Sequence, residues 1–232
     1  MKIGLLSALL TLFSFHSLAT SPDLIMVQGK CEKKVVPDRA AITFTAENTH
    51  KDQKKAFTKT TQEIEELKTQ IKKMKLKDSV LKSTGYQVHP VREYEKERLI
   101  DKGMRVSLSL RVETSEIEKI GDTLALASKL GINQVGNLET FLSLEKKRSE
   151  YLSCLDVAAE DAQLKAQRLS KKLNIKTGDV HKVIESPMPE TPPVFHGSPM
   201  MKSMSAEAMP APGIEAGEQD FSATVDLHYK IK

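Results

Sequence analysis

The sequence predicts an α+β fold in which hairpins build an antiparallel sheet and helices pack on one face of it. Two patterns support this class. Apolar side chains alternate with polar ones in several short segments, as in half-buried strands, and recur every three or four residues in three longer segments, as in amphipathic helices. Along the chain these segments follow the order ββαββαβαββ. Consecutive strands in this order favour antiparallel hairpins over parallel crossovers.

The first 19 residues have the three parts of a secretory signal peptide. A positive charge at Lys2 precedes an apolar run of about 13 residues, and small residues at Ser17 and Ala19 suit a cleavage site. The apolar run is shorter than the ~20 residues that cross a bilayer. We therefore expect cleavage after Ala19, export from the cytoplasm, and a mature domain that spans residues 20–232.

The composition is ordinary for a globular protein, with 39% hydrophobic and 28% charged residues. The formal net charge is +4 for the full chain and +3 once Lys2 is removed with the signal peptide. An excess this small does not favour nucleic acid as a partner. No later apolar run approaches membrane length, so we expect the exported domain to be soluble or peripheral.

The first two predicted strands flank a Pro-Asp pair. Side chains alternate from residue 24 to 36 and again from 40 to 46, and Pro37 and Asp38 lie between the two runs. Proline fixes φ and cannot donate a ladder hydrogen bond, and aspartate can bond its own backbone in an Asx turn. We therefore expect a turn that joins two paired antiparallel strands.

A helix and a second hairpin are predicted next. Residues 52–75 carry apolar side chains at alternating spacings of three and four, with lysines on the opposite side. Strands follow at 79–91 and 104–112, and the second of these alternates cleanly. The charged segment 92–103 between them is expected to be a hairpin connection with an exposed tip.

Two more helices follow this hairpin. The first, at 115–130, ends before Gly131, which suits a left-handed cap, and a strand is expected at 134–144. The second helix, at 147–173, has leucines and a central row of alanines at spacings of three and four. It would be roughly 40 Å long. Small alanine side chains let another backbone come close, so this helix should lie flat on a sheet or a partner helix.

The last two strands, at 179–186 and 220–231, are separated by a segment rich in proline and methionine. Residues 187–213 hold seven of the ten prolines and five of the nine methionines. Proline at this density excludes a regular helix or strand. We therefore expect a long mobile loop across 187–217.

Three motifs, in this order, resemble the SIMPL-domain family of exported bacterial proteins, which includes an oxidative-stress defence protein and an outer-membrane immunogen. The family has a V-x-G-x-G segment before Pro-Asp-x-Ala, an A-x-x-D-A-x-x-K-A helix pattern, and a proline-rich loop before its final strand. The matching residues are Val27, Gly29, Pro37, Asp38 and Ala40, then Ala158, Asp161, Ala162, Lys165 and Ala166, and finally Ile214 and Gly217. Cys31 replaces the second glycine of the first motif. The resemblance covers nearly the whole mature chain, from Leu24 to Ile231.

The resemblance implies an α+β fold, assembly into large rings or channel-like oligomers, and a role in envelope stress tolerance. It implies no catalytic residue. Glycine at position 31 would permit a β-bulge that cysteine does not favour, so the departure concerns the local geometry of the strand.

The charged residues of these motifs have structural interpretations that we prefer to catalytic ones. Asp38 suits an Asx turn, and Asp161 and Lys165 lie beside the alanine row, where hydrogen bonding and solvation account for them. The histidines, at positions 16, 50, 89, 181, 196 and 228, show no spacing typical of metal ligands. We therefore assign no catalytic, cofactor-binding or metal-binding residue.

Cys31 and Cys154 are the only cysteines. Both fall on apolar faces, so burial as small free thiols is the preferred interpretation. A disulfide is the second, since an exported protein meets an oxidising compartment and closing so long a loop would stabilise the fold by about 5 kcal/mol. A peroxidatic thiol is the third; lysines lie near Cys31, but there is no C-x-x-C and no paired histidine.

Two surface groups have alternative interpretations. The loop methionines and His196 could hold Cu(I) or consume oxidants, or they could pack against a neighbouring subunit. These methionines are Met188, Met200, Met201, Met204 and Met209. Lysines of the first helix, Lys68, Lys72 and Lys75 among them, could meet anionic headgroups at the outer membrane or remain solvated. Packing and solvation are the preferred interpretations.

From the sequence we expect a non-enzymatic exported protein of the periplasm that self-associates into a homo-oligomer through strand edges and helix seams. It would support envelope or oxidative stress tolerance, with a peripheral contact at the outer membrane and no nucleic-acid partner. The alternative is a periplasmic module that binds Cu(I) or oxidants with its methionine loop. The chain carries neither the G-x-S-x-G motif nor the H-E-x-x-H motif of known enzyme classes.

Overall fold

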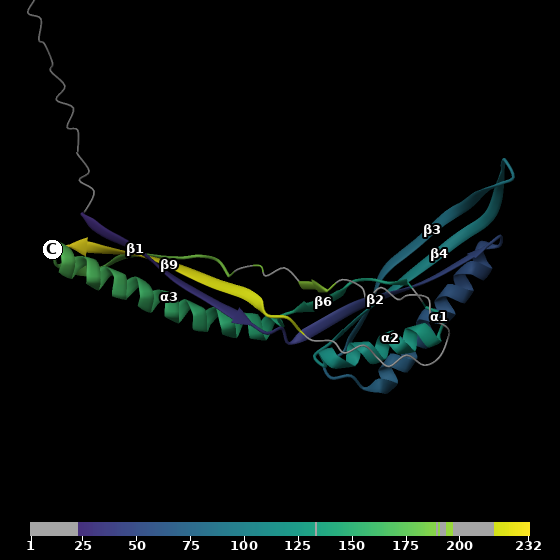
Figure 1. Cartoon of the computed structure of the whole chain (residues 1–232), viewed down its shortest axis with the longest axis horizontal. Helices are drawn as coiled ribbons and strands as arrows, with labels where there is room; N and C mark the ends of the chain where they lie inside the picture. The colour runs from purple at the N-terminus through teal and green to yellow at the C-terminus, as the bar shows by residue number, and fades with distance from the viewer. Residues whose placement is uncertain (1–22, 133, 189, 191–193, 197–215) are drawn as a thin grey trace, which may run out of the picture.

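The structure is a computed structural model that describes residues 23–132, 134–188, 190, 194–196 and 216–232. It is elongated, with one group of elements at each end (Figure 1). One group holds α3 (Leu144–Leu173) and a three-stranded sheet, and the other holds α1 (Gln53–Met74), α2 (Ile120–Lys129) and a larger sheet. The predicted signal peptide, residues 1–19, and most of the predicted loop lie outside the described residues.

The α+β class is confirmed, with antiparallel strands and helices packed on one face of the sheets. The strands form two sheets, where a single sheet was expected. The first sheet has the order β1-β9-β7, and the second has the order β3-β4-β2-β6-β8, with β5 paired to β2. The strands are β1 (Leu24–Val35), β2 (Arg39–His50), β3 (Val80–Glu95), β4 (Arg98–Thr114), β5 (Gln134–Val135), β6 (Leu138–Phe141), β7 (Thr177–Glu185), β8 (Val194–His196) and β9 (Gln219–Ile231).

The strands on either side of Pro37 do not pair with each other, so the predicted hairpin is wrong. β1 pairs with β9 along its whole length, from Leu24 opposite Lys230 to Val35 opposite Gln219. β2 pairs with β4 and with β6 in the other sheet. A Pro-Asp pair interrupts a strand locally. Whether the chain then turns back or continues into another sheet depends on which distant strand forms hydrogen bonds with the second segment.

Four other elements differ from the expected order. The connection expected at 92–103 is mostly strand, because β3 continues to Glu95 and β4 begins at Arg98. The strand expected at 134–144 is divided into β5 and β6, which both pair with β2. The helix expected at 115–130 begins as a short 3₁₀ turn, Ile117–Lys119, and continues as α2. The segment expected to be free of strands contains β8, which pairs with β6. β8 has three residues and pairs with a short strand, so sequence periodicity gives no signal for it.

α1 and α2 cover the second sheet and enclose the second core, which we define as the buried side chains between these two helices and β2 and β4. Phe44, Leu110 and Val112 of the sheet are at most 2% exposed, as are Leu67 of α1 and Ile120 of α2. The stripe predicted for the first helix is therefore mostly the stripe that is buried, except that Phe57 is 42% exposed and Ala56 is buried in its place. Alternate residues of β2 and β4 face this core.

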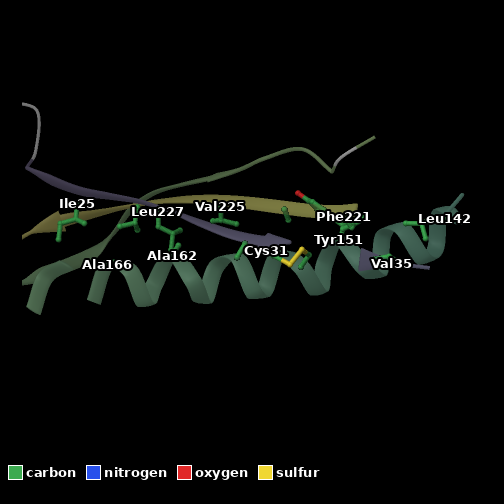
Figure 2. Packing of buried hydrophobic residues seen from close by; sticks show 14 residues of the cluster. Ile25, Cys31, Val35, Leu142, Tyr151, Ala162, Ala166, Phe221, Val225 and Leu227 are labelled. Carbon is green, nitrogen blue, oxygen red and sulfur yellow. A yellow bond between two sulfur atoms is a disulfide. The ribbon is translucent and has the colours of Figure 1, made fainter. Parts of the chain in front are cut away.

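α3 lies along β1 and β9 and encloses the first core, which we define as the buried side chains between this helix and the first sheet (Figure 2). The alanine row of α3 faces the sheet, with Ala158, Ala162 and Ala166 at most 2% exposed. A Cβ atom at Gly29 would lie 2.6 Å from the backbone nitrogen of Ala162 and 2.8 Å from its side chain. Glycine in β1 and alanine in α3 thus allow the helix and strand backbones to approach closely.

The helix ends follow local signals. Asp52 caps α1 by accepting a hydrogen bond from the Lys54 backbone N–H at 2.9 Å, and Ser143 caps α3 by accepting one from Lys146 at 3.1 Å. Both helices end in the left-handed region, at Lys75 with φ of 53° and at Asn174 with φ of 53°. These caps explain why both helices start and stop close to the predicted residues.

Candidate functional site

The described side chains do not converge on a metal centre. In the part of the chain that the structure describes, no group of three or more histidine, cysteine, aspartate or glutamate side chains could hold a metal ion. A hollow of about 440 Å³ lies between α1 and β3, lined by Gln53, Lys54, Phe57 and Tyr86. The two rings meet edge to face with their centroids 6.0 Å apart. This lining combines aromatic surface with one lysine and contains no carboxylate, histidine or thiol.

Cys31 and Cys154 form a disulfide between β1 and α3 (Figure 2). Their Cα atoms are 5.4 Å apart, within the usual range for a disulfide. Cys31 is 6% exposed and Cys154 is fully buried, so the predicted burial of both cysteines is confirmed. The preferred interpretation as free thiols was wrong, because alternation in β1 and the alanine row of α3 bring the two faces together. A peroxidatic role would need an exposed thiolate, which this bond does not provide.

Asp161 and Lys165 of α3 bind the open edge of β1. The backbone N–H of Lys30 donates to the Asp161 carboxylate at 2.9 Å, and the Lys165 ammonium donates to the carbonyl oxygen of Gln28 at 2.9 Å. Asp161 and Lys165 are themselves an ion pair at 2.7 Å. An edge strand leaves backbone N–H and C=O groups unpaired, and another chain could bind them. Here Asp161 satisfies one such N–H group and Lys165 one such C=O group.

Replacing Asp161 with asparagine should destabilise the protein near neutral pH and have less effect in acid. The hydrogen bonds from Lys165 and from the Lys30 backbone lower the pKa of Asp161 from its usual 3.8. A carboxyl group with a lowered folded-state pKa stabilises the fold above its unfolded pKa, and this contribution is lost as the pH falls through the folded value. The difference in Tm between wild type and Asp161→Asn should therefore shrink as the pH falls below 3.8.

Asp156→Asn is the matched control for this prediction. Asp156 is exposed on the same helix and forms no ion pair with any residue that the structure describes. Its replacement removes the same charge and should leave Tm nearly unchanged across the pH range. An Asp161→Asn difference that is the same at all pH values would contradict the assigned role of the Asp161 carboxylate.

Asp38 connects the segment between β1 and β2 to the start of α3. Its carboxylate accepts hydrogen bonds from the backbone N–H of Ser143 at 2.7 Å and from the Ser143 hydroxyl at 2.6 Å. The Lys146 ammonium donates to the carbonyl oxygen of Val36 at 2.8 Å beside it. Asp38 therefore binds the start of α3 rather than its own backbone, which corrects the predicted Asx turn. Its negative charge also lies at the positive end of the helix dipole.

Tyr151 and Glu185 form a polar contact that the sequence did not reveal. The Tyr151 hydroxyl lies 2.7 Å from the Glu185 carboxylate and 2.5 Å from the carbonyl oxygen of Ser186. Burial, together with the hydrogen bond to Glu185, raises the pKa of Tyr151 to about 12. A neutral tyrosine thus ties α3 to the end of β7. The available signal was the position of Tyr151 one turn before Cys154 in the buried stripe.

The other predicted surface groups are only partly described. Met188 is partly buried against the first core. Met200, Met201, Met204 and Met209 lie outside the described residues, and His196 lies in β8. On α1, Lys68 forms an ion pair with Glu65 at 3.1 Å, whereas Lys72 and Lys75 are exposed. The Cu(I) interpretation therefore remains a prediction.

Several apolar side chains lie outside both cores. β2 ends opposite Met104, and from there β3 and β4 continue as a two-stranded arm, which we define as residues 91–103. The arm projects from one end of the molecule (Figure 1). Tyr94 is 77% exposed, and Leu99, its direct partner across the arm, is 53% exposed. An unsupported two-stranded ribbon is marginally stable in water, so this arm is suited to contact with another surface.

Known proteins are similar to almost the whole length of this chain. The sequence model of the SIMPL family, described as a protein of unknown function (DUF541), matches residues 25–229. The 26 kDa periplasmic immunogenic protein of Brucella melitensis is 26% identical over 225 residues, which cover 94% of this chain and 88% of the relative. The uncharacterized protein YggE of Escherichia coli is 23% identical over 211 residues, covering 90% and 83%. The matched range includes both cores and the disulfide.

Proposed function

The chain belongs to the SIMPL family, and from this premise we propose that it is a non-enzymatic exported protein of the periplasm that self-associates into a homo-oligomer. The predicted signal peptide and the periplasmic name of the Brucella relative support the compartment. No helix among the described residues is long and apolar enough to cross a membrane. We further propose a role in envelope or oxidative stress tolerance, which is supported by the family resemblance.

The exposed arm is the observation that best supports self-association. Tyr94 and Leu99 place two large apolar side chains side by side where neither core can cover them. Burying such a pair against a second copy removes apolar surface from water and also supports the ribbon. A contact between two different surfaces of identical chains gives a ring when the rotation between neighbours closes.

The contact is proposed to use side chains rather than strand edges. Asp161 and Lys165 occupy the edge of β1. The register of β7 shifts twice along its pairing with β9, and β3 contains Pro90 and two register shifts. Bulges and edge prolines hinder the addition of a further strand. This narrows the earlier expectation, in which strand edges and helix seams made the contact.

Replacing both arm residues, Tyr94→Ser with Leu99→Ser, should weaken self-association at least tenfold, or about 1.4 kcal/mol. The measurement is light scattering coupled to gel filtration of the mature chain over a micromolar concentration series. Tyr86→Ser is the control, because Tyr86 is 55% exposed but lies outside the arm. A wild-type chain that is monomeric throughout the series would contradict the proposal.

The stress role has a separate test. A strain that lacks the gene should lose viability faster than its parent under peroxide, and the mature chain supplied from a plasmid should restore it. Equal survival of the two strains would remove this part of the proposal and leave self-association to be judged by light scattering.

A further inference from the structure

Three chain segments meet at the end of the molecule that is opposite the arm. The backbone N–H of Ile231 donates to the carbonyl oxygen of Asp23 at 3.0 Å, and that of Lys232 donates to Lys176 at 2.9 Å. Asn174 caps the end of α3 two residues before Lys176. Figure 1 shows the C-terminal end of β9 beside the end of α3. The start of β1, the end of α3 and the end of β9 therefore lie together at this end of the molecule.

This end of the molecule carries five exposed lysines. We call it the lysine tip and define it by Lys171, Lys172, Lys176, Lys230 and Lys232 together with the exposed apolar residues Leu169, Leu173 and Ile231. Asp23 and Asp179 are the acidic side chains in the same segments. None of the five lysines forms an ion pair with any residue in the described part of the chain. The helix dipole accounts for Lys171 and Lys172 in the last turn of α3, but not for the other three.

Apolar side chains are also exposed at this end of the molecule, on α3 and on the face of β9 opposite to Lys230 and Lys232. Leu173 is 62% exposed, Leu169 is 43% exposed and Ile231 is 36% exposed. The basic group at the end of α1 differs in this respect, because Leu76 beside it is 7% exposed and Met74 is packed against the second core. Basic side chains with exposed apolar ones between them are typical of a surface that rests on a membrane, where the ammonium groups reach phosphates and the apolar groups enter the headgroup layer.

We propose that the lysine tip binds the surface of a bilayer that contains anionic phospholipid headgroups. This inference rests on the export proposed above and names the surface that makes the membrane contact. Five flexible ammonium groups suit a fluid layer of phosphates, which needs no fixed arrangement of partners. From the sequence, the lysines of α1 were the alternative for a membrane contact, with solvation preferred. The structure favours the opposite end of the molecule for this contact, because charge and exposed apolar area coincide there.

Flotation of the mature chain with vesicles tests this inference. Vesicles with about 30% phosphatidylglycerol in phosphatidylcholine should carry the protein upward, whereas phosphatidylcholine alone should not, and salt should weaken the binding. Lys176→Gln, Lys230→Gln and Lys232→Gln together should weaken the partition at least tenfold. Lys72→Gln, Lys73→Gln and Lys75→Gln together remove the same charge from α1 and should change it less than twofold. Circular dichroism will show that both triple variants are folded.

Several outcomes would overturn the inference. Equal weakening by the two triple variants would indicate a response to net charge alone, and equal binding to neutral vesicles would remove the role of the headgroups. Absence of flotation would remove the contact itself. Absence of flotation together with binding of a polyglutamate peptide to the tip would assign it to an acidic protein partner instead. Light scattering on the same protein preparations separates this inference from self-association. A chain that is monomeric but floats with the vesicles would contradict the proposed homo-oligomer and leave the membrane contact of the lysine tip supported.

Discussion

Replacing Cys31 and Cys154 with alanine should lower the free energy of unfolding by about 3 to 5 kcal/mol, depending on how the protein unfolds. The disulfide joins residues 123 positions apart, and the whole second core lies between them. If the chain unfolds as one unit, the loop that is closed in the unfolded state is long and the loss approaches about 5 kcal/mol.

A smaller loss is expected if the second core stays folded while the first core unfolds. Arg39 and Phe141 are paired across β2 and β6, so a folded second core holds the ends of the intervening chain together. The closed loop then contains only about 20 residues and the loss is about 3 kcal/mol. Urea unfolding, followed by tyrosine fluorescence and circular dichroism, measures the loss and shows whether one or two transitions occur.

The control for this prediction is the reducing agent. Dithiothreitol should shift the urea midpoint of the wild type toward that of the Cys31→Ala, Cys154→Ala variant and should not change the variant itself. A variant that unfolds at the same urea concentration as the oxidised wild type would show that the bond adds no stability to the fold.

Replacing Gly29 with alanine should prevent α3 from seating on β1 and destabilise the first core by more than about 3 kcal/mol. The new Cβ atom would lie 2.6 Å from the backbone nitrogen of Ala162, and closer still to the carbonyl oxygen of Ala158. Both are backbone atoms of a helix, so no side-chain rotation can relieve the overlap. The helix would have to move away from the strand, which would separate the buried faces that form the core.

Gly136→Ala is the matched control for Gly29→Ala. A Cβ atom at Gly136 would lie 3.5 Å from the side chain of Thr43, an ordinary contact. We expect a loss of less than about 1 kcal/mol there. Thermal unfolding of the two variants and the wild type makes the comparison, and equal stability of both variants would show that the close approach of β1 and α3 does not limit packing.

The local patterns in the sequence predicted most single elements and little of how they combine. Most of the apolar stripe of residues 52–75 became the buried face of α1, although Phe57 is 42% exposed. In α3 the alanines of the predicted stripe face the sheet, but its leucines Leu152, Leu169 and Leu173 are exposed, and Tyr151 and Cys154 are buried instead. Both follow from the period of the helix, which depends on neighbours three and four positions away. β8 and the division into β5 and β6 were missed, because strands of two to four residues are too short to show a period.

The charged motif residues show the same limit at the level of the site. Sequence reasoning placed all three residues in the scaffold, but it gave Asp38 its own backbone as a partner and named no partner for Asp161 and Lys165. Asp38 binds Ser143 and the other two bind the edge of β1. Each partner is more than 100 positions away in the chain, and a local pattern contains no information about which distant backbone groups are left unpaired.

What the sequence by itself determined was the class of the fold, the identity of most helices and strands, much of the face that each would bury, and membership of the SIMPL family. The tertiary structure alone decided that β1 pairs with β9 rather than β2, that Cys31 and Cys154 are bonded, and that the lysines of residues 171–176 and of the end of β9 lie at one tip. The physical reason is distance along the chain. Periodicity and caps arise from neighbouring residues, whereas strand pairing, disulfides and surface charge depend on segments that only folding brings together.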